Sequence, residues 1–342
     1  MQIAVDVMGG DNAPACNIRG TCQAMTDFPD IRKFLLVGDS EIMKGELDLI
    51  RPSVDESRIE LVHASQSITM SEPSSTALRQ KKDSSITIAA ELLKNKQADA
   101  LVSAGHTGAA VAATVVKTRT LQGIERPGIA AVMPTPTGGS FLVLDVGANV
   151  DCKPIHLAQY ALLGEAYSRY ILQTPEPRVG ILSFGGEEQK GNELTKNAFK
   201  LLKQMPINFI GNIEGHDLFT NEIDVVVCDG FVGNVMLKAC ESMARAISQI
   251  LKSRMRKSPV RMAGALLSKN AFRELKELTD HEEYGGAPLL GINGNCIIAH
   301  GSSTPKAVRN AIRVAAEMVN NRVNEHIIEK VSSIDWQQLT TD

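Results

Sequence analysis

Short hydrophobic runs alternate along the chain with longer segments in which apolar residues recur every three or four positions. Runs that are apolar at nearly every position are typical of strands covered on both faces. This pattern predicts strands at 3–7, 34–37, 59–63, 100–103, 129–133, 141–146, 179–183, 208–211, 225–228 and 296–299.

The amphipathic segments predict helices at 85–96, 107–117, 155–172, 193–204, 235–252 and 305–330. The last is the clearest, because Thr304 suits a helix cap and Pro305 suits the first turn. Its apolar face is formed by Val308, Ile312, Ala315, Val319, Val323 and Ile327. Alternating strands and helices predict a three-layer α/β/α fold with a mainly parallel sheet. We expect residues 1–342 to form one catalytic unit of two lobes.

The composition excludes several classes of function. Aromatic residues make up 4% of the chain and the net charge is -3, so a nucleic-acid-binding surface is not expected. The first residues, MQIAVDV, are typical of a strand rather than a signal peptide, and no apolar run approaches the roughly 20 residues of a membrane span. The cysteines form no CxxC pair, which predicts reduced thiols in the cytoplasm.

Glycine-containing polar loops follow many of the predicted strands, at 8–11, 103–108, 145–149, 183–187, 229–234, 285–286 and 300–303. Ligands bind beyond the carboxyl ends of parallel strands, where glycine lets backbone amides approach an anion and a following helix adds its positive end. We therefore expect a phosphate-binding cradle along a single edge of the sheet. The alternative is that each loop is only a tight turn. None matches the dinucleotide or P-loop signature, which argues against NAD and ATP.

Seven segments resemble the bacterial phosphate acyltransferase family, which transfers acyl groups from acyl carrier protein to phosphate. They are VDVMGGDNAP (5–14), SAGHTGA (103–109), LDVGANVDCKP (144–154), EEQKGN (187–192), GNIEGHD (211–217), VVVCDGFVGNVMLK (225–238) and EYGGAPLLGINGNCIIAHGSS (283–303).

The resemblance implies a fold similar to that of phosphotransacetylase and of isocitrate and isopropylmalate dehydrogenases. It also implies a homodimer that supplies acyl phosphate for phospholipid synthesis. The implied partners are acyl carrier protein, inorganic phosphate, the membrane surface and the membrane glycerol-3-phosphate acyltransferase that uses acyl phosphate. One position departs from the pattern, because His106 stands where the resemblance implies Asn.

Transfer of an acyl group from a thioester to phosphate needs no cofactor, since phosphate is the nucleophile and a thiolate is a good leaving group. The protein must align the reactants and stabilise an oxyanion. The candidate catalytic residues are Lys190, His300, Asp229 and Asn234. The residues expected to bind phosphate or substrate are Gly9, Gly10, Asp11, Gly105, His106, Thr107, Gly108, Asn149, Lys153, Gly185, Gly186, Asn192, Gly233, Lys238 and Ser302.

Each candidate has a structural alternative. Lys190 suits a solvated turn, His300 suits a strand end, and Asp229 and Asn234 suit helix caps. Asp6, Asp11, Asp145 and Asp229 are carboxylates near strand ends, but no metal-binding signature is present, so no metal is predicted.

Residues 242–273 contain no Asp or Glu, and they predict a basic, amphipathic helical hairpin with Pro259 and Gly264 near its tip. Two functions suit this segment: docking of an acidic carrier protein and peripheral contact with an anionic membrane. The alternative is a solvated helix pair in a dimer contact. The residues expected to make these contacts are Lys252, Arg254, Arg256, Lys257, Arg261, Leu266 and Leu267.

Three other functions compete with the carrier-dependent acyltransferase. A phosphotransacetylase that uses acyl-CoA would need nearly the same chemistry. A decarboxylating dehydrogenase would need an arginine group and a metal-binding aspartate set, and neither is evident. A non-catalytic scaffold that binds acyl ligands at the membrane would not need so many polar glycine loops.

Overall fold

The computed structural model describes residues 1–50, 55–69, 71–279, 281–336 and 339. Its strands form one eleven-stranded sheet, in the order β3-β2-β1-β4-β11-β10-β5-β6-β9-β7-β8. The strands are β1 (Gln2–Asp6), β2 (Lys33–Gly38), β3 (Ile59–His63), β4 (Ala100–Ser103), β5 (Gly128–Pro134), β6 (Ser140–Leu144), β7 (Val179–Leu182), β8 (Phe209–Ile213), β9 (Val225–Val227), β10 (Ala287–Leu290) and β11 (Asn295–Ile298).

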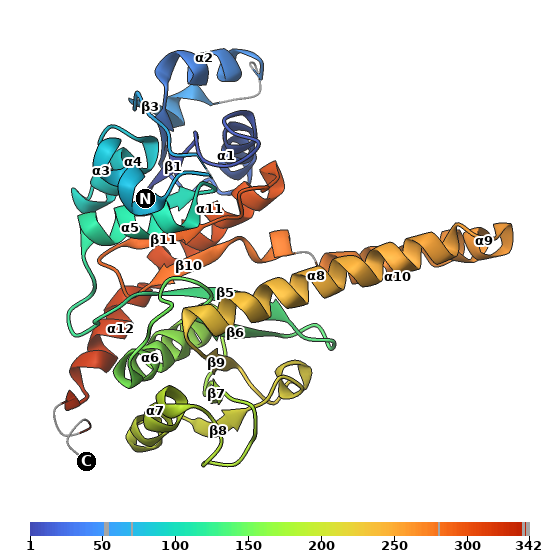
Figure 1. The fold of residues 1–342 in the computed structure, drawn as a ribbon. Coiled ribbons are helices and arrows are strands. Elements are labelled where there is room, and N and C mark those ends of the chain that lie inside the picture. The colour runs from blue at the N-terminus through green and yellow to red at the C-terminus, as the bar shows by residue number, and fades with distance from the viewer. Residues whose placement is uncertain (51–54, 70, 280, 337–338, 340–342) are drawn as a thin grey trace.

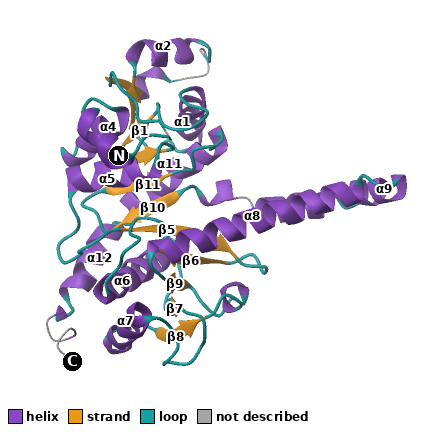
Figure 2. Ribbon diagram, viewed as in Figure 1, coloured by secondary structure: helices purple, strands orange, loops and turns teal. Residues whose placement is uncertain are grey.

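Helices cover both faces of this sheet, as Figures 1 and 2 show. The α-helices are α1 (Ala15–Asp27), α2 (Ser40–Asp48), α3 (Ser74–Gln80), α4 (Ser85–Lys94), α5 (Thr107–Thr118), α6 (Pro154–Tyr170), α7 (Glu193–Gln204), α8 (Gly230–Met255), α9 (Pro259–Leu267), α10 (Lys269–Thr279), α11 (Pro305–Asn320) and α12 (Val323–Ser332). Short 3-10 helices are η1 (Glu56–Arg58), η2 (Asp217–Phe219) and η3 (His281–Tyr284).

Two apolar cores lie on the two faces of the sheet. The first packs under α1, α2, α6, α7, α11 and α12, and the second packs under α3, α4 and α5. Alternate residues of one strand enter different cores: Leu142 and Leu144 of β6 join the first, whereas Phe141 and Val143 join the second. The predicted three-layer α/β/α fold is confirmed.

Strand direction changes near the middle of the sheet. β3, β2, β1, β4 and β11 run parallel to one another, and β6, β9, β7 and β8 form a second parallel set. The strand β10 is antiparallel to β11 and β5, and β5 is antiparallel to β6. The second set therefore runs opposite to the first.

Each predicted strand segment overlaps an observed strand, but β10 was missed. It holds Pro288 and follows Gly285 and Gly286, which are typical of turns. The predicted helix 305–330 is wrong in one respect, because it is two helices separated at Arg322, whose φ is 50°. The apolar spacing continues into α12, so the pattern does not reveal the break. Thr304 caps α11, and Pro305 occupies its first turn, as predicted.

The outer part of α8 projects from the body with α9 and α10, and we call residues 242–279 the arm (Figure 1). The helix α8 spans 26 residues, and its length is about 39 Å at 1.5 Å per residue. Along the arm Met243, Ile247 and Ile250 are exposed, and Leu266 and Leu267 at the far end are 72% and 89% exposed. None of the helices in the described residues has the length and apolar character needed to cross a bilayer.

Candidate functional site

The loops that follow β1, β4 and β11 lie together, and we call them the first loop group. In the sheet, Asp6 pairs with Ser103, which also pairs with Ile298. The amide of Asp11 donates to the carbonyl oxygen of Gly301 at 2.7 Å. A Cβ atom on Gly9 would lie 2.7 Å from the Cα atom of Gly105, so only glycine permits this approach. The predicted convergence of these loops is present in the structure.

The helix α5 begins in this group with amides that face no protein acceptor. The His106 ring accepts a hydrogen bond through Nδ1 from the Ala109 amide at 3.3 Å, so it caps the helix as an Asn side chain would. In the described residues, no acceptor is found for the amides of Thr107 and Gly108. The positive end of α5 is therefore open to an anion.

A small hollow of about 10 Å³ lies beside His106. It is lined by Asp6, Gly9, Ile68, Ser85, Ile86, Ser103, Gly105, His106 and Ala109. Asp6 is buried at the end of β1, and burial raises the pKa of its carboxyl group. Sequence reasoning considered Asp6 only as a metal ligand. The sequence feature that could have indicated Asp6 is its position as a single carboxylate at the end of an apolar strand.

His300 and Ser302 belong to the same group at the end of β11. The Nδ1 atom of His300 lies 2.8 Å from the Ser302 hydroxyl oxygen and accepts from the Ser302 amide at 3.2 Å. Both residues are exposed. Their local contacts hold the imidazole at the strand end.

The loops that follow β6, β7 and β9 form the second loop group, and its centre is the carboxylate of Asp145. Its Oδ1 atom accepts from the amides of Ile129, Gly147 and Ala148, and its Oδ2 atom accepts from the amide of Asn149 at 2.8 Å. Burial nevertheless raises the pKa of this carboxyl group. Asp145 thus shapes the loop on which Asn149 is carried.

The first turn of α8 packs against this loop. Asp229 caps the helix by accepting from the amides of Phe231 and Val232 at 3.0 and 2.9 Å. The Gly233 amide donates to the Asp229 carbonyl oxygen, so the prediction that this amide binds phosphate is not supported by its bonding. A Cβ atom on Gly233 would lie 1.9 Å from the carbonyl oxygen of Asp145. The side chain of Asn234 lies against Gly147.

The loop between β7 and α7 carries Lys190, which is exposed. The stem of Lys190 crosses Gly185, where a Cβ atom would lie 2.7 Å from the Lys190 Cγ atom. The Gly186 amide donates to the Glu214 carboxylate at 3.1 Å. Asn192 caps α7 by accepting from the Thr195 amide at 2.9 Å. Lys153, which precedes α6, and Lys238 of α8 are exposed.

The two loop groups do not share one edge of the sheet. Because β6, β7 and β9 run opposite to β1, β4 and β11, their carboxyl ends lie at the other edge. The prediction of a single edge carrying every glycine loop is therefore wrong. Hydrophobic runs in the sequence indicate which residues are buried, but they carry no information on strand direction.

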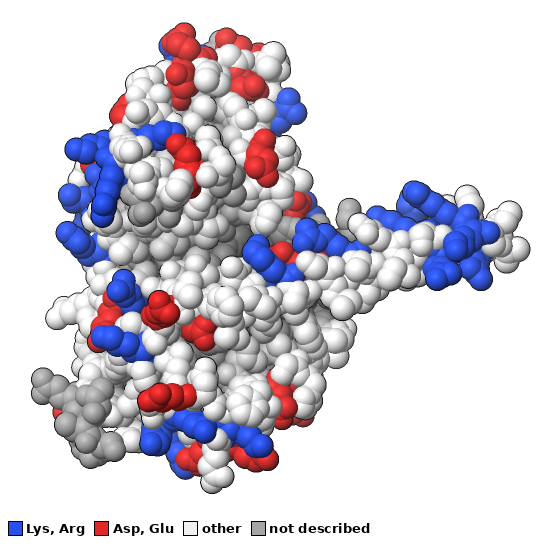
Figure 3. Space-filling view, viewed as in Figure 1, with Lys and Arg blue, Asp and Glu red and all other residues white. Residues whose placement is uncertain are grey.

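The basic residues predicted for carrier or membrane contact lie on the arm. Lys252, Arg254, Arg256, Lys257 and Arg261 are all exposed. Figure 3 shows positive side chains gathered towards the free end of the arm, with uncharged surface at the tip. Among the described residues, no group of three His, Cys, Asp or Glu side chains is placed to hold a metal ion.

Comparison with known proteins identifies the family. The sequence model described as "fatty acid synthesis protein" matches residues 1–326. The chain is 48% identical over 342 residues to the phosphate acyltransferase of Pelobacter propionicus, covering 100% of this chain and 97% of that protein. This chain belongs to the phosphate acyltransferase family. It is therefore an enzyme, a transferase of acyl groups.

Solved structures share the fold of this family member at low sequence identity. A phosphotransacetylase from Streptococcus pyogenes matches with a TM-score of 0.63 and 16% identity over 94% of each chain. A 4-hydroxythreonine-4-phosphate dehydrogenase from Klebsiella pneumoniae matches with a TM-score of 0.52 and 13% identity, covering 93% of this chain and 99% of that one. The predicted likeness to phosphotransacetylase is confirmed at the level of the fold.

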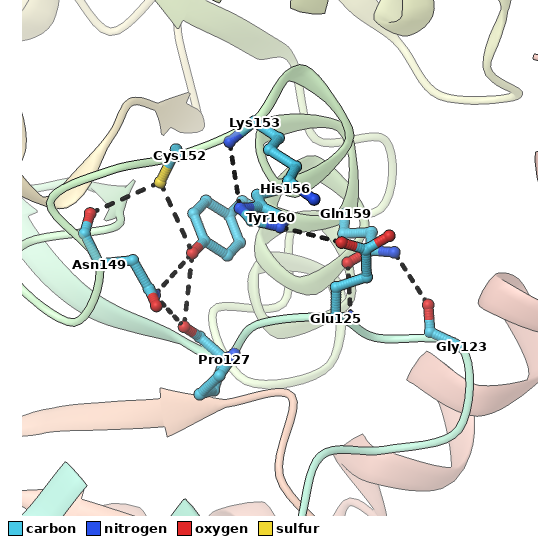
Figure 4. A network of polar contacts seen from close by, with 9 residues as sticks. All are labelled: Gly123, Glu125, Pro127, Asn149, Cys152, Lys153, His156, Gln159 and Tyr160. Carbon is cyan, nitrogen blue, oxygen red and sulfur yellow. Dashed lines mark hydrogen bonds and ion pairs between the residues drawn. The ribbon is translucent and has the colours of Figure 1, made fainter. Parts of the chain in front are cut away.

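A partly buried polar network supports the second loop group (Figure 4). The Asn149 side-chain amide donates to the Tyr160 hydroxyl at 2.7 Å and to the Pro127 carbonyl oxygen at 2.6 Å. His156 accepts through Nδ1 from the Lys153 amide, and its Nε2 atom lies 3.1 Å from the Glu125 carboxylate. The side-chain amide and the backbone amide of Asn149 thus donate to groups that support the loop. Asn149 therefore has no free donor for the predicted binding of phosphate among the described contacts.

His156 makes stability depend on pH. Burial lowers its pKa, and the Glu125 carboxylate only partly offsets this, so the neutral ring is favoured in the folded protein. The unfolded chain takes up a proton near pH 6.5, and the stability that His156 contributes is lost as the pH falls through the folded pKa. We expect the urea midpoint of the wild type to fall between pH about 7.5 and about 5.5 more steeply than that of His156→Gln.

At neutral pH the same substitution should cost about 1–2 kcal/mol, since two hydrogen bonds to the ring are lost. His216→Gln is the control, because the His216 side chain is 74% exposed. Equal pH slopes for wild type and His156→Gln would show that the ring is not held neutral.

Proposed function

We propose that the protein transfers a fatty acyl group from acyl carrier protein to inorganic phosphate and releases an acyl phosphate for phospholipid synthesis. The supporting observation is the open first turn of α5 beside a narrow hollow. Phosphate bound at the amides of Thr107 and Gly108 would lie next to this hollow, at whose mouth we propose that the thioester binds. Attack by phosphate needs no acyl-enzyme and no cofactor, since the nucleophile is a substrate.

We propose that His300 acts on the acyl carbonyl. It lies at the end of β11, in the same loop group as Gly9, Gly10 and Gly105. An imidazole N–H or nearby backbone amides directed at the carbonyl oxygen would stabilise the oxyanion that forms on attack. Ser302 fixes the ring orientation through its contact with Nδ1.

The second loop group adds positive charge from the other lobe. The strands β1 and β9 are six places apart in the sheet. A twist of about 20–25° per strand accumulates to about 120–150°, so the opposite strand direction is largely compensated and the carboxyl ends point within about 30–60° of each other. We propose that Lys190 thereby faces the phosphate across the space between the lobes, with Asn234 beside it.

The basic arm suits an acidic protein as acyl donor. Its exposed cations lie on a segment without Asp or Glu from 242 to 273. Electrostatic attraction between these cations and a negatively charged carrier raises the rate at which the two proteins associate. This feature favours acyl carrier protein over acyl-CoA, which carries no comparable protein surface.

The arm also suits a peripheral contact with the cytoplasmic face of an anionic membrane. Val260, Met262, Leu266 and Leu267 are exposed at its end, next to the cations. Apolar side chains enter the interface while Lys and Arg bind headgroups. This placement would deliver acyl phosphate to the membrane glycerol-3-phosphate acyltransferase.

A second copy of the chain is the proposed occupant of the inner arm. Met243, Ile247 and Ile250 follow helical spacing on α8, and they are 62%, 57% and 59% exposed. Exposure of a row of apolar side chains to water is unfavourable, and homodimers that pack helix against helix cover such a row.

A direct assay tests the reaction. Purified enzyme with acyl carrier thioester and phosphate should yield acyl phosphate and free carrier thiol, measured by mass spectrometry and thiol titration. A parallel reaction with acyl-CoA compares the two possible acyl donors. Turnover of acyl-CoA without turnover of the carrier thioester would contradict the proposal. Binding of the carrier thioester without turnover would support a scaffold instead.

Lys190→Ala should raise the KM for phosphate by roughly tenfold or more, because one cation facing the dianion is lost. The KM for the acyl donor should change little. Lys203→Ala is the matched control, since Lys203 pairs with Glu188 on the surface. Unchanged turnover of Lys190→Ala at limiting phosphate would remove this residue from the site.

Charge reversal of Arg254, Arg256 and Lys257 to Glu should lower kcat/KM for the carrier thioester about tenfold at low salt, and less at high salt. It should also release the protein from vesicles that contain phosphatidylglycerol. Reversal of Lys196, Lys200 and Lys203 on α7 supplies an equal change of charge elsewhere. If neither kinetics nor vesicle binding responds to the arm variant, the arm has no docking role.

A further inference from the structure

Asp6 carries a buried oxygen for which the described part of the chain supplies no partner. Its residue is 3% exposed, at the end of β1. The Oδ2 atom accepts from the Ser103 hydroxyl at 2.8 Å. The Oδ1 atom has no hydrogen-bond partner among the described residues. A buried polar atom left in this way is costly, which points to a group that arrives from outside.

The hollow gives this carboxyl group access to a ligand. Ile68, Ile86 and Ala109 form an apolar wall, and His106 lies at the same hollow. A Cβ atom on Gly9 would lie 2.8 Å from Asp6 Oδ2, and one on Gly105 would lie 3.4 Å from it. Glycine at these two positions therefore keeps the approach to the carboxyl group free of side chains.

The surroundings favour the protonated carboxyl group. Among the residues that line the hollow in the described chain, none is Lys or Arg. Burial raises the pKa of Asp6, and the nearby hydroxyls of Ser85 and Ser103 and the amides of Met8 and Gly9 offset it only in part. Of these four groups, only the Ser103 hydroxyl lies in hydrogen-bond geometry with the carboxyl group, so Oδ1 stays without a partner among the described residues. A protonated carboxyl group has one O–H donor to offer.

We propose that Asp6 is the catalytic acid that protonates the sulfur atom of the departing carrier thiol. This role rests on the proposed acyl transfer to phosphate. A phosphate oxygen bonds to the acyl carbon, the carbon–sulfur bond breaks, and its electron pair leaves with sulfur. The proton of Asp6 moves to that sulfur and gives the thiol. The proton that hydrogen phosphate loses on forming the dianionic acyl phosphate returns to Asp6, so the enzyme is unchanged.

The hollow suits sulfur better than phosphate. Its lining is part apolar and part polar, and no Lys or Arg is among the described residues that form it. A phosphate dianion needs donors and positive charge. Those are available immediately beside it, at the open amides of α5. After proton transfer, the Asp6 carboxylate retains the Ser103 hydrogen bond and lies near the positive end of α5. The two reactants thus share the wall formed by Gly105 and His106.

Asp6→Asn tests this role, because the amide keeps the shape of the carboxyl group but has no proton to give. With acyl carrier thioester, kcat should fall by about a hundredfold or more, the usual scale of general acid catalysis. The decisive probe is the same carrier with selenium in place of the sulfur of its pantetheine arm. A selenolate departs without protonation, so the loss with the selenoester should be about tenfold or less.

Ser103→Ala is a second variant, which removes only the hydroxyl that supports Asp6. It should show a smaller loss with the same preference for the selenoester. Equal losses with both donors, in either variant, would overturn the proposal and leave Asp6 a structural residue. Failure of the wild type to form acyl phosphate from either donor would instead contradict the proposed function.

Stability measurements give a readout independent of turnover. Because the folded pKa of Asp6 is raised, the folded state holds this proton more tightly, and stability falls as the pH rises through the folded pKa. The free energy of unfolding of Asp6→Asn should lack this decrease. Parallel pH profiles for wild type and variant would show that Asp6 is ionised throughout and cannot donate a proton.

Discussion

Burial of the sheet on both faces is the constraint on which the rest of the molecule depends. Residues such as Leu142 and Phe141 alternate between two separate apolar cores, and the strand backbones satisfy one another. Polar side chains are therefore few along the central strands, and they gather where these strands end. The chemistry of the protein is concentrated in glycine loops because the layers leave no other site for it.

Periodicity in the sequence predicted the strands, the layers and most of the helices, since these follow from which residues are buried. It did not predict β10, where Pro288 and the preceding glycines resemble a turn. It also missed the break at Arg322, because one residue in a left-handed conformation leaves the apolar spacing intact. Periodicity carries no information on strand direction, and for this reason the prediction that every glycine loop lies at one edge of the sheet was wrong.

The candidate site was predicted by residue type, and residue type alone does not separate anion binding from helix capping. His106, Asn192 and Asp229 all cap helices, since a side-chain acceptor at a helix start satisfies its first amides. The free donors are instead the amides of Thr107 and Gly108, which any residue carries. Asp6 was undervalued because its isolation from other charges becomes visible only once the loops are folded.

The unbroken course of α8 has a mechanical consequence. Its first turn is fixed against the Asp145 loop through Gly233, and its last turn lies in the arm. A rod of this kind keeps the catalytic body at a set height above whatever surface holds the tip. The part of α8 that lies in the arm, residues 242–255, sets this height, and it is about 21 Å long at 1.5 Å per residue.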